Sequence, residues 1–576
     1  MLPRALCLLL FAFPLAAQQP AGSPAHPALP SAQGFQISGT VIHALNAEPL
    51  AGVEVAVAPT GKRDDFHTTV TDANGRFLFR DVAAGKYILA AKHRGFPQQL
   101  FEGHGPFSTA IAAGVGKNSE DLVFRLKPEG SISGRITDEQ DDPVRAASVM
   151  LFVRNVESGE HTINLQLRAS TDDQGGYHFG HLPAGSYYVA VSAKPWYAVN
   201  DHTGGRKVVP TSAGENPELD VAYPTTYYRQ AIEPEQANPI RLNWGDRLTA
   251  DIMLHAVPAL HLRLTNQNPG VQNPNSQNPN SQNQDPAAGF EEAMLKQTLL
   301  GGTEVFVETQ TVNVAPNAVE ISGVPPGRYD LSVVMAKEKN GVGTSSSRHQ
   351  AVNVSSSGDV DPSRGSELAA ISGTVVFENQ QGALPDASLQ FHSHESGQYF
   401  DAPVSANGGF DLPEVHPGRY DVVLLNSGDL ALKSISAMGA KVTGETVEIA
   451  GPGRVHLALI ASKGNGRLEG VVLRGDKPVG GAMVVLVPRD PANNWPLFRR
   501  DQSDSDGSFE LSTVMPGAYT LLAIENGWEL EWANPAVLES YLPQGQPVQV
   551  EADSRLKINI KSVPLHGTPD NPSPTK

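Results

Sequence analysis

Apolar and polar residues alternate in short runs along most of this chain. One such run occurs twice in the first third of the chain. "TDANGRFLFRDVAAGKYILAA" begins at Thr71, and "TDDQGGYHFGHLPAGSYYVAV" begins at Thr171. In both, two apolar side chains stand two positions apart before a central glycine, and apolar side chains occupy every second position after it. Because a period of two gathers side chains on one face of a β-strand, the pattern predicts pairs of half-buried strands joined by tight turns.

The pattern recurs along the chain with fixed spacing. Counted from a first glycine, apolar residues stand at +2, +4 and +7, a second glycine at +10 and a tyrosine at +12. The first position is Gly75, Gly175, Gly408 or Gly507 in four copies and Asn317 in a fifth. The +10 and +12 positions are Gly85 and Tyr87, Gly185 and Tyr187, Gly327 and Tyr329, Gly418 and Tyr420, and Gly517 and Tyr519.

The polar and small residues of the repeat have a local physical explanation. Asp or Asn beside the first glycine is typical of a turn that needs positive φ, and asparagine enters the left-handed region at low cost, which accounts for Asn317. We expect the +10 glycine to reverse the chain, also with positive φ. We expect the tyrosine to be a core and corner residue, similar to the tyrosine corner of other β-sandwiches.

A second shared element lies before four of the copies. The segments "ISGTV" at Ile37, "ISGRI" at Ile132, "ISGTV" at Ile371 and "LEGVV" at Leu468 each precede a proline-led strand, and each unit closes with another alternating strand. The spacing from Gly39 to Gly134 is 95 residues, the size of a seven-stranded sandwich. The copy around Asn317 lacks a recognisable first strand.

These signals predict an all-β chain, a tandem array of Ig-like β-sandwich domains behind a signal peptide. One segment, "NQNPGVQNPNSQNPNSQNQDP" at 266–286, is too polar to order itself and is predicted to be a linker or a long disordered loop. The expected organisation is a signal peptide at 1–17, a flexible leader at 18–33, sandwiches at 34–128 and 129–257, a degenerate sandwich at 258–368 that contains 266–286, sandwiches at 369–462 and 463–564, and a disordered tail at 565–576.

The first residues are typical of an export signal. Arg4 precedes an apolar run at 6–13 that is too short to span a bilayer, and small residues favour cleavage after Ala17. Cys7, the only cysteine, lies inside this segment, so neither a disulfide nor a lipid anchor is expected in the mature chain. We therefore expect a secreted, periplasmic or extracellular protein without a transmembrane segment. Its net charge of −18 argues against nucleic acid or an anionic membrane as partner.

At the level of whole motifs, "ISGTV…PLAGVEVAV…TTVTDANGRFLFRDVAAGKY" resembles the carboxypeptidase regulatory-like domain. This resemblance implies a transthyretin-like (prealbumin-like) β-sandwich, grouped with the carbohydrate-binding-like folds. It also implies an accessory role, because such domains sit behind the catalytic domain of some secreted zinc carboxypeptidases and ahead of the membrane domain of many outer-membrane receptors. Function resides in sites carried by a fold, so the resemblance implies the fold more strongly than the function.

Two short motifs contain some, but not all, of the residues of a catalytic or metal site. "HSHE" at 392–395 matches the His-x-x-Glu pair of a zinc carboxypeptidase, but it follows a strand of a repeat unit, and two histidines do not make a catalytic site. "DQSDSDG" at 501–507 lacks the first and last ligands of a calcium loop, so a hairpin turn is favoured. No nucleophile elbow, P-loop or dinucleotide fingerprint is found. We expect no catalytic residue, no bound metal and no cofactor.

Aromatic residues in loop-like stretches of the second and fifth units are the remaining functional signal. Such rings either stack on sugars or pack between neighbouring domains, and the sequence leaves both interpretations open. The candidate ligand-binding aromatics are Trp196, Tyr197, Tyr227, Tyr228, Trp495, Trp528, Trp532 and Tyr541.

Three functional hypotheses follow. The first is a non-catalytic exported scaffold that binds a glycan or an envelope protein. The second is a carbohydrate-binding protein that uses the aromatics of the second and fifth units, and the third is an enzyme related to the metallocarboxypeptidases. The sequence leaves the oligomeric state open.

Overall fold

A computed structural model describes residues 34–62, 65–156, 159–198, 218–265, 290–315, 318–339, 342–365, 368–378, 386–394, 397–428, 430–463 and 466–565. The predicted signal peptide, the leader, the polar segment at 266–286, Asn317 and residues 566–576 of the predicted tail lie outside the described residues. Among the helices that the structure does describe, none has the length and apolar character needed to cross a bilayer.

The described chain folds into successive two-sheet units, which we call domains 1 to 5. Domain 1 has sheets of order β4-β1-β8 and β3-β2-β5-β6, with β7 also paired to β5. Its strands are β1 (Phe35–His43), β2 (Glu54–Pro59), β3 (His67–Val70), β4 (Arg76–Val82), β5 (Gly85–His93), β6 (Phe96–Leu100), β7 (Ile111–Ala113) and β8 (Leu122–Leu126).

Domain 2 repeats this plan with an additional two-stranded sheet, β14-β19. Its elements are β9 (Gly130–Thr137), β10 (Ser148–Asn155), β11 (Thr162–Ser170), β12 (Gly176–Leu182), β13 (Gly185–Ser192), β14 (Val221–Ala222), β15 (Thr226–Tyr227), the 3-10 helix η1 (Pro234–Gln236), β16 (Ile240–Leu242), β17 (Arg247–Thr249), β18 (Ile252–Met253) and β19 (Val257–Pro258).

Domain 3 has sheets of order β23-β24-β20-β27 and β22-β21-β25-β26. Its first strand, β20, ends directly before the polar segment, so that segment joins the first two strands of one domain. The elements are β20 (Leu260–Thr265), β21 (Phe290–Thr298), η2 (Leu300–Gly302), β22 (Glu304–Phe306), β23 (Gln310–Ala315), β24 (Ala318–Val324), β25 (Gly327–Lys339), β26 (Val342–Val354), β27 (Gly358–Val360) and η3 (Pro362–Arg364).

Domains 4 and 5 complete the series. Domain 4 comprises β28 (Ala369–Phe377), β29 (Ser388–Ser393), β30 (Tyr399–Pro403), β31 (Gly409–Val415), β32 (Gly418–Leu425), β33 (Leu430–Met438), β34 (Lys441–Thr443), β35 (Thr446–Ile449) and β36 (Gly453–Lys463). Domain 5 comprises β37 (Gly466–Arg474), β38 (Lys477–Pro478), β39 (Met483–Pro488), η4 (Trp495–Leu497), β40 (Arg499–Gln502), β41 (Ser508–Val514), β42 (Gly517–Ile524), η5 (Gly527–Glu529), α1 (Pro535–Leu538), η6 (Leu542–Gln544), β43 (Gln546–Val550), β44 (Arg555–Lys557) and β45 (Ile560–Lys561).

The glycine of the "ISG" motif lets two strands approach closely. In domain 1, β1 pairs antiparallel with β4 and parallel with β8. A Cβ at Gly39 would lie 2.2 Å from the carbonyl oxygen of Leu122, and one at Gly373 would lie 2.2 Å from that of Leu457. In domain 3 the equivalent residue is Leu264, which is why the first strand of that domain escapes recognition in the sequence.

The first glycine of the repeat has the backbone conformation that the turn chemistry predicts. The φ angles are 72° at Gly75, 74° at Gly175, 82° at Gly408 and 77° at Gly507. In domain 1 the Asp72 carboxylate accepts hydrogen bonds from two amides of the same turn, 2.8 Å and 2.9 Å long. Side chain and glycine together therefore define the hairpin.

The expectation of positive φ at the +10 glycine is wrong in four of the five copies; the exception is Gly418, with a φ of 157°. The φ angle is not positive at Gly85, Gly185, Gly327 or Gly517. The left-handed residue lies at +6, where the first sheet carries a β-bulge and its register shifts. The φ values at +6 are 55° at Asp81, 57° at His181, 76° at Gly323, 58° at Glu414 and 56° at Thr513.

The +10 glycine instead makes room for the tyrosine that follows it. A Cβ at Gly185 would lie 3.3 Å from the ring of Tyr187, and one at Gly517 would lie 3.3 Å from the ring of Tyr519. Every one of the five tyrosines donates its hydroxyl to the carbonyl four residues earlier, which is the geometry of a tyrosine corner. These bonds run from Tyr87 to Ala83, from Tyr187 to Pro183, from Tyr329 to Pro325, from Tyr420 to His416 and from Tyr519 to Met515.

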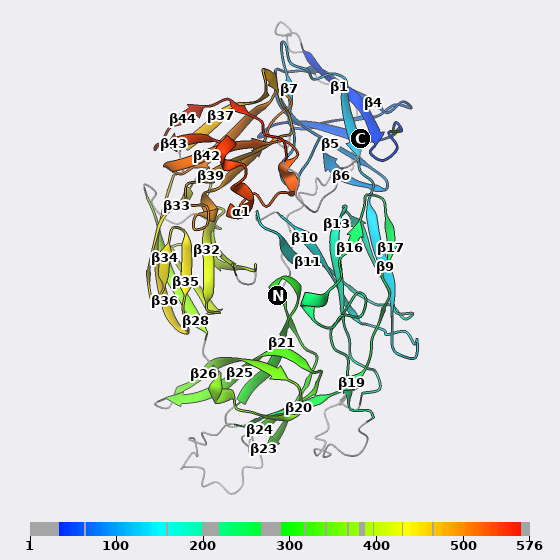
Figure 1. Ribbon diagram of the computed structural model, residues 1–576, viewed down its shortest axis with the longest axis vertical. Helices are drawn as coiled ribbons and strands as arrows, with labels where there is room; N and C mark the ends of the chain where they lie inside the picture. Colours follow the sequence, from blue (N-terminus) through cyan, green and yellow to red (C-terminus); the bar gives the residue numbers. More distant parts are fainter. Residues whose placement is uncertain are drawn as a thin grey trace, which may run out of the picture.

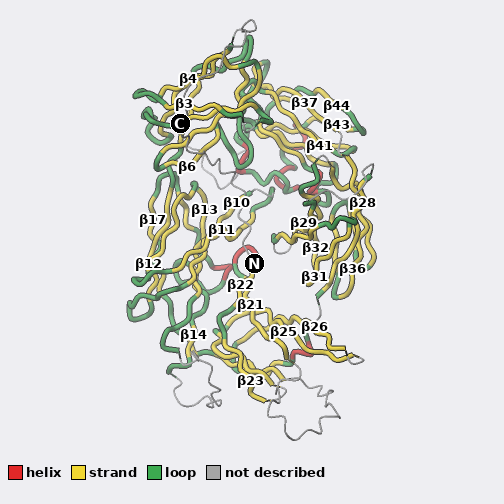
Figure 2. The backbone as a smooth tube through the Cα atoms, turned by 180° about the vertical axis from the view of Figure 1, so that it is seen from behind, coloured by secondary structure: helices red, strands yellow, loops and turns green. Residues whose placement is uncertain are grey.

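The domains are arranged as a closed ring. Figure 1 shows domain 1 in blue, domains 2, 3 and 4 following in cyan, green and yellow, and domain 5 in orange and red beside domain 1. The view from behind in Figure 2 shows the same neighbours. The Ser505 amide of domain 5 donates to the carbonyl of Ala110 in domain 1 over 2.9 Å, so the ends of the series are hydrogen-bonded to each other.

Substitution of Thr513 by asparagine should stabilise domain 5. A β-branched residue is disfavoured at positive φ, whereas asparagine tolerates it, so Thr513→Asn should raise the free energy of unfolding by about 0.5 to 1 kcal/mol. Thermal unfolding followed by circular dichroism measures the change. Asp81→Asn at the same repeat position is the matched control and should change little, while a less stable Thr513→Asn protein would contradict the bulge assignment.

Candidate functional site

A cavity of about 320 Å³ lies where domains 2, 4 and 5 meet. Domain 2 contributes His161 and Thr162 to its wall, domain 4 contributes His392 and His394, and domain 5 contributes Trp495. Its volume falls at the lower end of small-molecule sites, which range from about 300 to 1,000 Å³. This is the place in the described chain where aromatic, imidazole and carboxylate groups line one hollow.

A histidine and an aspartate form the polar side of this cavity. His394 Nε2 lies 2.9 Å from Asp421 Oδ2, and the Thr446 hydroxyl donates to Asp421 Oδ1 over 2.6 Å. The hydrogen bond to Asp421 raises the pKa of His394, although burial acts in the opposite direction. The Asp421 carboxylate is therefore held between two donors and favours a protonated imidazole.

His392 occupies a more apolar part of the same wall. Its ring stacks on Tyr399 at 4.5 Å and lies 5.6 Å from the ring of Trp495. Both ring nitrogens are buried without a hydrogen-bond partner, and burial lowers the pKa of this histidine. Glu395, the last residue of the "HSHE" motif, lies outside the described residues.

The two tryptophans of the 527–533 region pack between domains. Trp528 is 9% exposed, stacks on His104 of domain 1 at 4.7 Å, and donates its indole N–H to the Gly481 carbonyl. Trp532 is 6% exposed and donates its indole N–H to the Val156 carbonyl of domain 2. The guanidinium of Arg500 lies 3.9 Å from the centroid of the Trp532 ring. Neither ring is a flat platform that faces solvent.

The other aromatic candidates of the sequence are dispersed. Trp196 is 83% exposed, whereas Tyr227 and Tyr541 are buried at 1% and 2% exposure. Tyr197 and Tyr228 are half-buried. Trp495 is therefore the one candidate of this set that lines the cavity, and the structure does not bring the set together.

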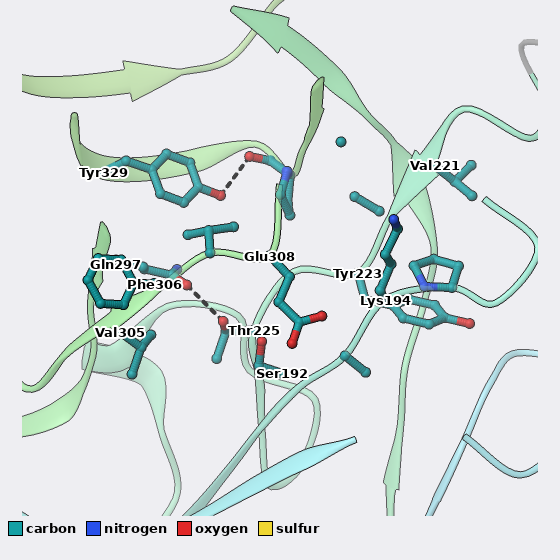
Figure 3. A pocket seen from close by; sticks show the side chains of 16 residues that line it. Ser192, Lys194, Val221, Tyr223, Thr225, Gln297, Val305, Phe306, Glu308 and Tyr329 are labelled. Atoms are coloured by element: carbon teal, nitrogen blue, oxygen red, sulfur yellow. Dashed lines mark hydrogen bonds between the residues drawn. The ribbon is translucent and has the colours of Figure 1, made fainter. Parts of the chain in front are cut away.

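A smaller cavity of about 30 Å³ lies between domains 2 and 3. In Figure 3 the hydroxyl of Thr225 donates to the side chain of Gln297, and the bond from Tyr329 to Pro325 closes another wall. A space of this volume admits a water molecule, not a sugar ring. Beside it, Leu299 and Leu300 of domain 3 pack on Phe152 of domain 2, and Arg328 of domain 3 pairs with Glu235 of domain 2 at 2.8 Å.

The motif "DQSDSDG" at 501–507, which we call the acidic turn, is the main docking element of domain 5. Gln502 is 1% exposed, and its amide donates to the Glu102 carbonyl over 2.7 Å and to the Thr109 hydroxyl over 2.8 Å. His104 Nδ1 lies 3.1 Å from Gln502 Oε1. The turn thus inserts a fully hydrogen-bonded glutamine into domain 1.

Charged groups surround this glutamine. Asp504 accepts the Ala110 amide over 3.2 Å and pairs with Lys86 at 2.5 Å. Asp506 pairs with Lys117 at 2.6 Å. The motif was predicted to be a turn, but its role in the interface was not predicted. The three aspartates in one short turn are the sequence signal of that role.

The first two repeat units match a known domain family. The family model described as "Carboxypeptidase regulatory-like domain" matches residues 36–127 and 131–223. Domains 1 and 2 belong to the carboxypeptidase regulatory-like domain family. The two regulatory-like matches together span less than half of the chain. Domains 3 to 5 share the central strand pairing of domains 1 and 2, with the additional edge strands β23 in domain 3 and β33 and β34 in domain 4.

Solved structures with weak overall likeness include a Bacillus anthracis protein and two pilins. The Bacillus anthracis TIE protein is 14% identical with a TM-score of 0.17, over 74% of this chain and 73% of that protein. GBS52, the minor pilin of Streptococcus agalactiae, is 14% identical with a TM-score of 0.20, over 39% and 97%. BcpA, the major pilin subunit of Bacillus cereus, is 12% identical with a TM-score of 0.13, over 58% and 99%. No curated protein matches the chain.

Removal of Trp528 should destabilise the protein far more than removal of an exposed tryptophan. Because the ring is buried against domain 1, Trp528→Ala should lower the free energy of unfolding by about 3 to 5 kcal/mol. Trp196→Ala should change it by less than about 0.5 kcal/mol. Urea unfolding followed by circular dichroism compares the two, and equal midpoints would contradict the packing role.

A buried glutamate at the junction of domains 4 and 5 should make stability depend on pH. Burial raises the pKa of Glu445 from 4.5 to about 8, against the opposing charge of Arg499. Since the unfolded chain releases this proton near its ordinary pKa, the free energy of unfolding falls as pH rises from about 4.5 to 8. Glu445→Gln should remove this decline and add roughly 1 to 3 kcal/mol at pH 7.

Thermal unfolding of wild type and Glu445→Gln at pH 4, 7 and 8.5 measures this difference. The matched control is Glu448→Gln, because Glu448 lies exposed on the adjoining strand β35. A wild-type protein that gains stability between pH 5 and 8 relative to Glu445→Gln would show that the carboxylate is charged in the folded state.

Proposed function

We propose that this chain is a non-catalytic, exported scaffold of the cell envelope that folds into a closed ring and presents binding surfaces on it. The observation that supports this most is the docking of domain 5 on domain 1, two domains that lie at opposite ends of the described chain. Regulatory-like domains in positions 1 and 2 agree with an accessory role. The predicted signal peptide supports a location in the periplasm or outside the cell.

Ring closure supports a scaffold because it fixes the relative positions of the domains. Domains that touch only their sequence neighbours are free to hinge, as interdomain interfaces within one chain are often small. Here the acidic turn adds a contact that chain connectivity does not impose. A second brace joins domain 5 to domain 2, where the Ala533 amide donates to the Gly159 carbonyl over 2.9 Å and the His161 amide donates to Glu531 over 3.0 Å. A frame held at several junctions can present its surfaces at constant spacing.

Carbohydrate binding is the second candidate and has narrower support. Its rings would now have to be Trp495, in the wall of the central cavity, and the exposed Trp196, since Trp528, Trp532 and Tyr541 are committed to packing. Enzymatic activity related to the metallocarboxypeptidases remains the least supported hypothesis. The cavity therefore supports a binding role for the scaffold without identifying the class of ligand.

Charge reversal at the closing contact tests the scaffold proposal. Lys86→Glu places a second carboxylate against Asp504, so the ring should open and the radius of gyration from small-angle X-ray scattering should increase. Lys86→Glu combined with Asp504→Lys restores opposite charges and should return the radius to the wild-type value.

The control for this experiment lies at the equivalent turn of domain 2. Asp172 caps its own turn, accepting the Gln174 amide over 2.9 Å, so Asp172→Lys should leave the radius of gyration unchanged. A Lys86→Glu protein with the wild-type radius would argue against a closed ring maintained by the acidic turn.

A further inference from the structure

The junction of domains 3 and 4 carries a cluster of metal-ligating groups. Glu304 on β22, Asp330 on β25 and His416 between β31 and β32 each offer one ligand atom, and these atoms all lie within 4.8 Å of one another. His416 Nε2 is 3.9 Å from Glu304 Oε1 and 3.9 Å from Asp330 Oδ2. The three side chains come from both domains, so the cluster bridges the junction.

Neighbouring side chains hold the two carboxylates in position. Lys296 pairs with the other oxygen of Glu304 at 3.2 Å, which leaves Oε1 facing His416. His349, 6% exposed, lies with Nδ1 3.4 Å from Asp330 Oδ2, and its Nε2 lies 3.1 Å from the Ser347 hydroxyl. Oriented second partners of this kind are typical of metal-binding carboxylates.

The tyrosine corners fix where these ligands stand. Asp330 directly follows the corner Tyr329 of domain 3. The carbonyl of His416 accepts the hydroxyl of the corner Tyr420 in domain 4 over 2.8 Å. Asp330 and His416 therefore lie beside tyrosine corners, whereas Glu304 comes from strand β22.

We propose that Glu304, Asp330 and His416 bind a divalent transition-metal ion, with Zn²⁺ as the expected ion, and that this ion fastens domain 3 to domain 4. A tetrahedral ion with bonds of about 2.0 to 2.2 Å separates its ligand atoms by about 3.3 to 3.6 Å. The two distances from His416 to the carboxylates, 3.9 Å each, need to close by only a few tenths of an ångström, whereas the two carboxylates, within 4.8 Å of each other, need to move together by up to about 1.5 Å. One imidazole with two carboxylates suits zinc, whereas calcium takes six to eight oxygens. A fourth position stays open to water.

Zinc titration of the full-length mature protein, after treatment with a chelator, tests this site. Isothermal titration calorimetry should show one saturable equivalent of Zn²⁺ in wild type that is lost in His416→Ala and in Asp330→Asn. His416→Ala keeps the backbone carbonyl that Tyr420 uses, so the domain should still fold. His178→Ala, at an exposed histidine on β12, is the matched control and should retain the equivalent.

Thermal unfolding provides the second readout. Zn²⁺ should raise the melting temperature of wild type and of His178→Ala but not that of His416→Ala. Wild type without saturable uptake, or uptake that His416→Ala leaves intact, would overturn the site. Only the role of the metal ion, to fasten two domains of the ring, rests on the proposed scaffold function. A closed ring by X-ray scattering without zinc uptake rejects the metal site alone. Zinc uptake by an open ring rejects the scaffold arrangement alone.

Discussion

Asp504 stands where Asp72 and Asp172 cap their own turns, but its carboxylate crosses to domain 1. The turn remains intact because Asp506 takes over the local role and accepts the Ser508 amide over 3.2 Å. Asp506 thus frees Asp504 to make an interdomain contact. This exchange of hydrogen-bond partners contributes to ring closure together with the buried Gln502 and with the brace between domains 5 and 2.

The junctions of the ring differ in chemistry, and this decides how each responds to its surroundings. Domains 2 and 3 meet through apolar side chains, including Leu299 and Leu300, and through ion pairs of Arg328 with Glu233 and Glu235. Domains 5 and 1 meet through Gln502 and two ion pairs, and domains 3 and 4 through carboxylates and imidazoles. The Asp504 and Asp506 side chains are 13% and 17% exposed, so their ion pairs act together with the buried glutamine and the stacked Trp528 in the closing contact.

The sequence predicted the sandwiches well because their determinants are local and repeated. Alternation, the "ISG" glycine and the corner tyrosine all recur with the same spacing. The bulge at +6 was not predicted, because Asp81, His181, Glu414 and Thr513 share positive φ but no residue type. Glycine is the residue from which positive φ is usually predicted. The candidate site was harder to predict, because the residues that contact an aromatic ring lie far away in the sequence. Trp528, for example, stacks on His104.

The position of the polar segment has a consequence for a chain that has been cut. Residues 266–289 join β20 to β21, and β20 is paired with both β24 and β27 of the same sheet. A protease that cleaved this segment would leave the first strand of domain 3 covalently attached to domains 1 and 2 and hydrogen-bonded to the rest of domain 3. The two fragments would remain one particle, as in a complementation pair, and would separate only on denaturation.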